Sequence, residues 1–176
     1  MILTVEEYRL LNPADTQADA ALELRLRALE SAVRAWTHND FTRRGLRCVC
    51  PVQGGELGAA PDWLSVGDTV QITESAYNNG VYDVIGRRGD TAALHEELQG
   101  DEYVRVTKVV YPSDVKLGIV SLMKWDAEKR DKVGISSETL SRHSITYADM
   151  TGSTNAELGY PKSLLGFLTP YMKARF

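Results

Sequence analysis

Apolar residues in the first quarter of the chain recur at helical spacing and predict two helices. Thr4 and Glu7 fit a capping box at the start of a short helix within residues 1–12, which the breaker "NPAD" ends. Up to about Phe41, apolar positions then recur every three or four residues, as in a helix with one buried face. That face consists of Leu22, Leu26, Leu29, Val33 and Trp36.

After Phe41 the period of the pattern changes from that of a helix to two residues. Segments such as "LRCVCPV", "VGDTVQIT" and "EYVRVTKVVYP" alternate as strands with one buried face do. Asn78, Asn79 and Gly80 tolerate the positive φ of a tight hairpin turn, so we expect a turn there. About five short strands between residues 46 and 111 would form a small barrel or rolled sheet.

Helical spacing returns at Ser113 and runs to Gly134, a suitable residue to follow a helix. The apolar face of this helix is Val115, Ile119, Leu122 and Met123. We expect a last helix to begin at Pro161 and to kink at Pro170, because the proline ring crowds the carbonyl four residues earlier.

The order of these elements predicts a mainly α protein with an inserted sheet. Residues 1–45 and 110–176 would form a small helical bundle, because neither part can bury its apolar stripe alone. The bundle would carry an extended arm at residues 134–160, which is far longer than the roughly 2–8 residues of usual helix connections. A small antiparallel β domain, SH3-like or a rolled sheet, would occupy residues 46–109, so that the chain is α+β overall.

Charge divides along nearly the same boundaries. Residues 1–47 carry seven acids and seven bases, residues 48–112 ten acids and four bases, and residues 113–176 seven acids and nine bases. Some SH3-like barrels bind nucleic acid, but phosphate binding needs clustered lysines and arginines. The acidic insert opposes it, so a nucleic-acid-binding SH3-like module with helical flanks is the alternative interpretation.

The chain offers few residues for catalysis or metal binding. Cys48 and Cys50 are expected to point to opposite faces of a strand, which argues against a disulfide between them. With three scattered histidines they match no usual metal-ligand spacing. Serines surround His143 in "SSETLSRHSITY", but no nucleophile elbow, P-loop or H-E-x-x-H motif accompanies them. We therefore expect no catalytic residue, cofactor or metal.

The arm is the segment best suited to a partner. From Ser137 to Tyr147 polar and apolar residues alternate weakly, and such an extended segment can add to the sheet edge of a neighbour. The expected contact residues are Ser137, Glu138, Arg142, Ser144, Ile145 and Tyr147. Glu138 and Arg142 could form ion pairs between subunits. The remaining interpretation is a linker, which the composition of "DMTGSTNAELG" supports.

The helical pieces together resemble the head–tail connector (head-completion or adaptor) proteins of tailed bacteriophages and prophages. The matching pieces are Pro112 to Lys116, Gly134 to Leu140, Ser144 to Tyr147 and Tyr160 to Phe176. The helix "LRALESAVRAWTHNDF" is similar to the first long helix of that family. The resemblance covers about residues 1–45 and 110–176, and the block at 46–111 looks like an extra β domain of some phage members.

The resemblance implies a structural virion protein with no catalytic site and no cofactor. The protein would be made in the host bacterial cytoplasm, would involve no membrane and would be monomeric when isolated. At the head–tail junction it would form a ring, dodecameric in the virion, below the portal protein. The ring would extend the DNA channel, dock the tail or stopper protein, and let DNA pass without sequence-specific binding. Its arms would become ordered on docking.

Overall fold

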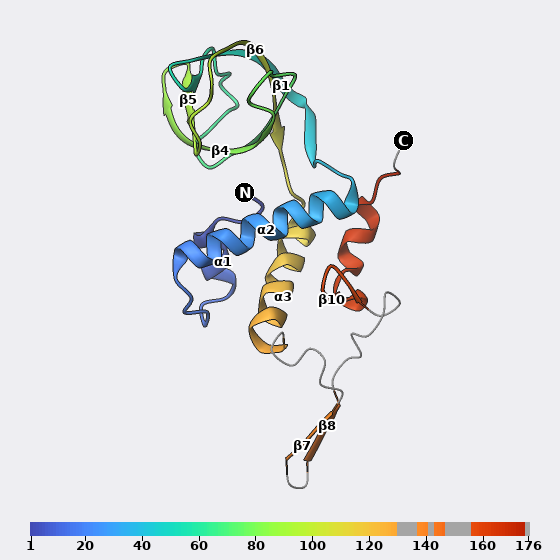
Figure 1. Ribbon diagram of the computed structural model, residues 1–176. Coiled ribbons are helices and arrows are strands. Elements are labelled where there is room, and N and C mark those ends of the chain that lie inside the picture. The colour runs from blue at the N-terminus through green and yellow to red at the C-terminus, as the bar shows by residue number, and fades with distance from the viewer. Residues whose placement is uncertain (130–136, 141–142, 147–155, 175–176) are drawn as a thin grey trace. The chain divides into compact units, whose positions relative to one another are not determined.

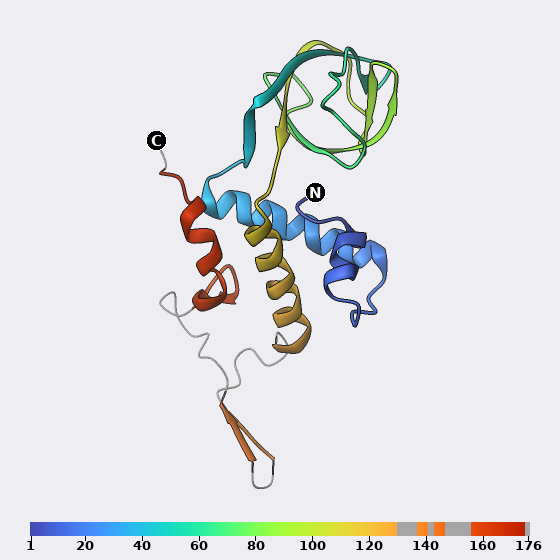
Figure 2. The same ribbon diagram turned by 180° about the vertical axis from the view of Figure 1, so that it is seen from behind.

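The computed structural model describes residues 1–129, 137–140, 143–146 and 156–174, and the chain divides into two compact units (Figure 1, and from behind in Figure 2). The barrel unit comprises Met1–Ile2 and Asn39–Tyr111, and the helical unit comprises Leu3–His38 and Pro112–Phe176. The chain is α+β, with about 35% helix and 30% strand, so the prediction of a mainly α protein is wrong. The inserted segment forms six strands rather than about five, and the C-terminal segment is not an α-helix.

The barrel unit, all of which is described, is a closed antiparallel sheet of six strands. Their order around the barrel is β1-β2-β5-β4-β3-β6, and β6 pairs with β1 to close it. The strands are β1 (Thr42–Gln53), β2 (Glu56–Leu57), β3 (Thr69–Thr73), β4 (Gly80–Arg88), β5 (Thr91–Leu94) and β6 (Asp101–Val109). Alternate residues of these strands point inward, and the buried core includes Val52, Leu57, Leu64, Val70, Ile72, Val84, Ala92, Val104 and Val106.

The segment around Asn78 is a cross-link between loops rather than a tight hairpin turn. Neither Asn78 nor Asn79 has a positive φ, and β3 and β4 are joined by a longer loop in which Glu74 has φ 60°. The buried Asn78 side chain donates to the Gln99 carbonyl at 2.8 Å and accepts from the Gln99 N–H at 2.9 Å. It thereby joins the β3–β4 loop to the β5–β6 loop, which a turn signal in the sequence does not reveal.

Cys48 and Cys50 lie on the same face of β1, contrary to the expectation from the sequence. Side chains alternate along a strand, so residues two apart share a face, and the expectation of opposite faces misapplied this rule. The two sulfur atoms are 3.3 Å apart. Both thiols are free, with Cys50 fully buried and Cys48 partly exposed.

The helical unit contains α1 (Val5–Leu11), α2 (Asp19–Thr37) and α3 (Ser113–Lys129). The predicted capping box of α1 is confirmed, because Thr4 and Glu7 exchange both hydrogen bonds. On α2 the predicted face is buried as far as Val33, but Thr37 takes the last buried position and Trp36 is partly exposed. On α3 all four predicted face residues are buried.

A polar cluster joins three parts of the helical unit. Arg25 of α2 lies 3.2 Å from Asp126 of α3, which also accepts a hydrogen bond of 2.8 Å from the Tyr160 hydroxyl. The Tyr160 ring packs at 5.5 Å from that of Trp125. The Asp126 side chain is largely buried, and its two donors compensate the carboxylate, so the cluster can fix the C-terminal segment against α2 and α3.

The C-terminal segment is built from turns, so the predicted helix from Pro161 is wrong. Strands β9 (Ala156–Glu157) and β10 (Tyr160–Pro161) form a hairpin whose two linking residues, Leu158 and Gly159, have φ of 54° and 78°. Two 3₁₀ helices follow, η2 (Lys162–Leu164) and η3 (Gly166–Tyr171). Pro170 offers no N–H to an α-helix, and shorter i→i+3 bonds such as Leu168 to Leu165 replace the α pattern.

Gly118 of α3 makes possible the close contact between α3 and η3. A methyl group at this position would collide with the Phe167 ring, whereas one at Gly166 would meet open space. We expect Gly118→Ala to lower the free energy of unfolding of the helical unit by about 1–2 kcal/mol, since the clash outweighs the gain in helix propensity. Urea unfolding followed by helical circular dichroism measures this. Gly166→Ala is the control, and an equal effect of both variants would contradict the close contact.

Candidate functional site

The predicted arm contains a β-hairpin of strands β7 (Ser137–Leu140) and β8 (His143–Thr146) (Figure 1). Ser137 and Glu138 belong to β7, where they pair with Thr146 and Ile145. Ser144 and Ile145 belong to β8, and Ser144 pairs with Thr139. Arg142 and Tyr147 lie outside the described residues. Four of the six predicted contact residues are therefore in one hairpin, and the side-chain ion pair predicted for Glu138 and Arg142 stays a prediction.

The hairpin has no further strand beside it within the described parts of the chain. Strands β7 and β8 form a sheet of two, in which each pairs only with the other. A two-stranded hairpin alone is marginally stable in water, and in the described residues the outer edge of each strand pairs with no other strand. The backbone of this segment is thus suited to pairing with, or being covered by, another surface.

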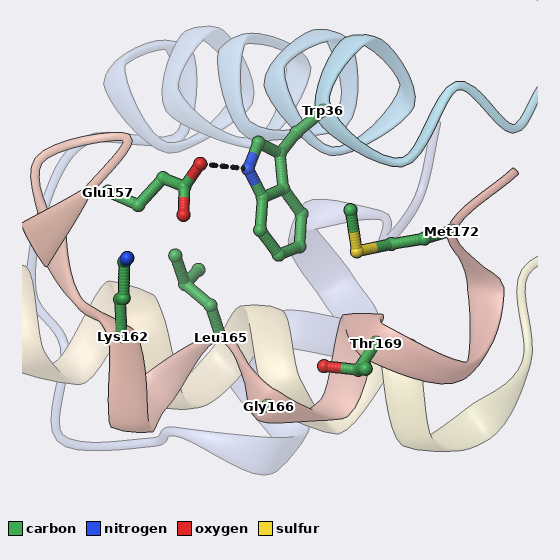
Figure 3. A pocket seen from close by; sticks show the side chains of 7 residues that line it. All are labelled: Trp36, Glu157, Lys162, Leu165, Gly166, Thr169 and Met172. Atoms are coloured by element: carbon green, nitrogen blue, oxygen red, sulfur yellow. Dashed lines mark hydrogen bonds between the residues drawn. The ribbon is translucent and has the colours of Figure 1, made fainter. Parts of the chain in front are cut away.

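A pocket of about 310 Å³ lies between the end of α2 and the C-terminal 3₁₀ helices (Figure 3). We call it the Trp36 pocket. Its lining residues are Trp36, Glu157, Lys162, Leu165, Gly166, Thr169 and Met172. Figure 3 shows Leu165 and Met172 pointing toward the indole ring of Trp36, while Glu157 and Lys162 lie together at one side. The pocket thus has an apolar centre and a charged rim.

The indole of Trp36 is held by a charge-assisted hydrogen bond. Its Nε1–H donates to the Glu157 carboxylate at 2.8 Å. The backbone N–H of Lys173 donates to the Thr37 carbonyl at 2.8 Å, which fixes the end of α2 to the chain that follows η3. These contacts keep the two walls of the pocket together. The lining suits a ligand side chain with an apolar body and a polar end, and it pairs no nucleophile with a base.

A second hollow of about 350 Å³ runs between α1 and α3. We call it the leucine groove, and its lining residues are Leu3, Glu7, Leu10, Leu11, Ser113, Lys116 and Leu117. Leu10 is 82% exposed and Leu117 is 54% exposed, so much of this apolar surface faces water. One ion pair crosses the groove, with Lys116 Nζ 2.9 Å from a Glu7 carboxylate oxygen. An exposed apolar patch with a polar rim is typical of interaction surfaces.

Two opposing influences set the pKa of Glu7. Partial burial raises the pKa, but the hydrogen bond from Lys116, the bond to the Thr4 backbone and the Lys116 charge together lower it below its ordinary value of 4.5. The carboxylate is therefore the favoured form, as its place in the first turn of a helix also requires.

The described residues contain no group of three or more histidine, cysteine or acidic side chains placed to hold a metal ion. Of the helices in the same residues, none combines the length and the apolar composition that a membrane span requires.

No protein-family model matches this chain, and no curated protein matches it.

Sequence reasoning missed the Trp36 pocket because it assigned Trp36 to the buried face of α2. Steps of three and four residues from Val33 lead to Trp36 and Thr37, and both are compatible with a helical period. The structure buries Thr37, whose hydroxyl donates to the Val33 carbonyl at 2.7 Å, and leaves Trp36 at the pocket. Only the position of η3 beside α2 selects between them.

The bond between Trp36 and Glu157 is testable by a double-mutant cycle. Trp36→Phe removes the indole N–H and Glu157→Met removes the acceptor, so we expect a coupling energy of about 1–2 kcal/mol in urea unfolding of the helical unit. The matched cycle of Trp36→Phe with Lys162→Met should give a coupling near zero, because an ammonium cannot accept the indole N–H. Equal coupling in the two cycles would count against the hydrogen bond.

The lowered pKa of Glu7 predicts a stability that depends on pH. A carboxyl whose pKa is lower in the folded state stabilises fully above its unfolded pKa of about 4.5 and ceases to do so as the pH falls through the folded value. Glu7→Gln should therefore cost about 0.5–1 kcal/mol near neutral pH and progressively less below about pH 4.5. Thermal unfolding across this pH range measures the difference from the unsubstituted chain.

The control for that experiment is Glu6→Gln. It removes the same charge from the neighbouring exposed residue but leaves the capping box and the Lys116 ion pair in place. A pH-dependent loss of equal size in Glu6→Gln would mean that general charge, and not the contacts of Glu7, is responsible.

Proposed function

We propose that the protein is a structural assembly protein of the phage head–tail connector type, which attaches to its neighbours through the β7–β8 hairpin and the helical unit. The observation that carries the proposal is the hairpin, whose strands pair only with each other in the described chain. A hairpin that is marginally stable alone would gain stability when a neighbouring subunit pairs with its strands or covers them. The stretches that carry the resemblance, Gly134 to Leu140 and Ser144 to Tyr147, include most of this hairpin.

The surface of the helical unit supports the same role. The Trp36 pocket and the leucine groove both belong to this unit, and both combine apolar walls with a charged rim. Aromatic and leucine-rich hollows of this kind receive side chains of a partner protein. Two such surfaces on one unit fit a subunit with a neighbour on each side of a ring, where contacts are head-to-tail.

In this proposal the role is architectural, without a catalytic step or a cofactor. The protein would be made in the bacterial cytoplasm, remain monomeric in isolation and enter a ring, dodecameric in the virion, at the head–tail junction. The ring would contact the portal protein and the tail or stopper protein. DNA would pass through the ring without sequence-specific binding, and the net negative charge of the barrel unit disfavours DNA binding by that unit, since like charges repel.

A second candidate is a nucleic-acid-binding barrel, which the arginines of β1 favour. Arg43, Arg44 and Arg47 are exposed and belong to the barrel unit, although the predicted boundary at residue 46 left Arg43 and Arg44 outside the insert. With these arginines and Asp40 included, the side chains of the barrel unit carry eleven acids and seven bases, a net charge of −4. Binding to duplex DNA that weakens steeply with salt and is lost in Arg43→Ser/Arg44→Ser would support this candidate.

The assembly role is testable by placing a charge in the hairpin. Mixed with a phage portal protein, the chain should form rings visible by electron microscopy, with slower backbone hydrogen exchange at residues 137–146 in rings than in monomers. We expect Ile145→Asp to reduce ring formation at least about tenfold, because a carboxylate in a packed interface is costly.

Leu24→Asp is the matched control, since Leu24 is 71% exposed on α2. This variant should assemble like the unsubstituted chain, and both variants should unfold at similar urea concentrations. Failure of the unsubstituted chain to assemble, equal hydrogen exchange in monomer and ring, or full assembly of Ile145→Asp would each contradict the proposal.

A further inference from the structure

The two cysteines of β1 form a close pair of thiols inside the barrel unit. Their sulfur atoms are 3.3 Å apart, within hydrogen-bonding distance for sulfur. Cys50 is fully buried in the barrel core, and Cys48 is partly exposed beside that core. The pair lies where β1 joins β6, because Cys48 is opposite Val106 and Cys50 is opposite Val104.

The separation of the sulfurs is close to that of a bonded pair. A disulfide needs about 2.05 Å between sulfurs, so closing this pair requires an approach of just over 1 Å. Residues two apart in a fully extended strand lie near the upper limit of the Cα separation that a disulfide spans. Here the strand can adjust, because the β1–β6 register shifts between Cys50 and Val52. Pro51, which lies between Cys50 and Val52 at this shift, has no N–H to lose from the hydrogen bonds between the strands.

We propose that Cys48 and Cys50 are a redox-modification site, which closes to an intramolecular disulfide by exchange with a small-molecule disulfide such as oxidised glutathione. This property is independent of the proposed role in assembly. It assigns Cys48 as the residue that reacts first and Cys50 as the residue that resolves the mixed disulfide.

The exposure of the two thiols determines this order. The Cys48 thiolate attacks one sulfur of the reagent, one reagent thiolate leaves, and a mixed disulfide forms on Cys48. The Cys50 thiolate then attacks the Cys48 sulfur and expels the second reagent thiolate. Two protons and two electrons pass from the pair to the reagent, which becomes two thiols. Cys50 cannot react first with an external molecule, because it is buried.

The hydrogen bond between the thiols makes the first step slow. The contact with Cys50 and partial burial raise the pKa of Cys48, so that little of it is thiolate near neutral pH. The same contact lowers the pKa of Cys50. The first step should therefore speed up with pH, and a disulfide across so short a loop should be easily reduced, because strained disulfides have more oxidising potentials.

The test is intact mass spectrometry of the folded full chain incubated with oxidised glutathione, with alkylation of the remaining thiols under denaturing conditions. We expect both thiols to disappear together, the mass to fall by two hydrogen atoms, and dithiothreitol to restore both thiols. A chain that keeps both thiols free, or that keeps glutathione attached, would overturn the proposal.

Two single variants test the order of reaction. Cys50→Ala should retain one glutathione on Cys48, because no resolving thiol is present. Cys48→Ala should react at least about tenfold more slowly, because its remaining thiol is buried. Equal reaction rates in Cys48→Ala and Cys50→Ala would overturn the assigned order. Circular dichroism verifies that each variant folds. If Cys50→Ala does not fold, the mass of the unsubstituted chain decides whether the disulfide forms.

Discussion

The pairing of β1 with β6 is the interaction on which this architecture depends. It closes the barrel and also joins the two ends of the inserted segment, because Thr42 near the start pairs with Val109 near the end. Just outside the strands, the Val110 N–H donates to the Phe41 carbonyl at 2.9 Å, and the rings of Phe41 and Tyr111 lie 5.0 Å apart. A long segment can be inserted between α2 and α3 at little entropic cost when its own contacts hold its ends together.

The two units differ in their cores, surfaces and reactive groups. The barrel unit contains a core made mainly of valine and leucine side chains, an acidic surface interrupted by the arginines of β1, and the paired thiols. The helical unit contains the Trp36 pocket and the leucine groove, and β7 and β8 also belong to it. Several of its elements are joined by polar contacts such as Arg25–Asp126 and Lys116–Glu7. The barrel, in contrast, is closed on itself by strand pairing.

Local features were predictable from the sequence because neighbouring residues determine them. The capping box of Thr4 and Glu7 depends on residues three apart, and the alternation in β3 and β6 depends on residues two apart. The opposite faces expected for Cys48 and Cys50 misapplied a local rule, but other failed predictions involve positions whose surroundings come from distant parts of the chain. Asn78 looked like a turn residue, but Gln99 of another loop bonds both of its polar groups. The segment after Pro161 has a helical pattern, yet Pro170 and the contacts with α2 and α3 favour 3₁₀ turns.

The sequence by itself determined the places of α1, α2 and α3, the β character of the inserted segment and its acidic charge, since periodicity and composition are properties of the chain alone. Only the tertiary structure decided that the strands close into a barrel, because closure depends on the pairing of β1 with β6. Only it placed Trp36 at a pocket and Thr37 in the core, because both positions satisfy the helical period. The thiol pair depends on both the sequence and the tertiary structure. Strand periodicity places Cys48 and Cys50 on one face, and the distance between their sulfurs depends on how β1 bends in the sheet.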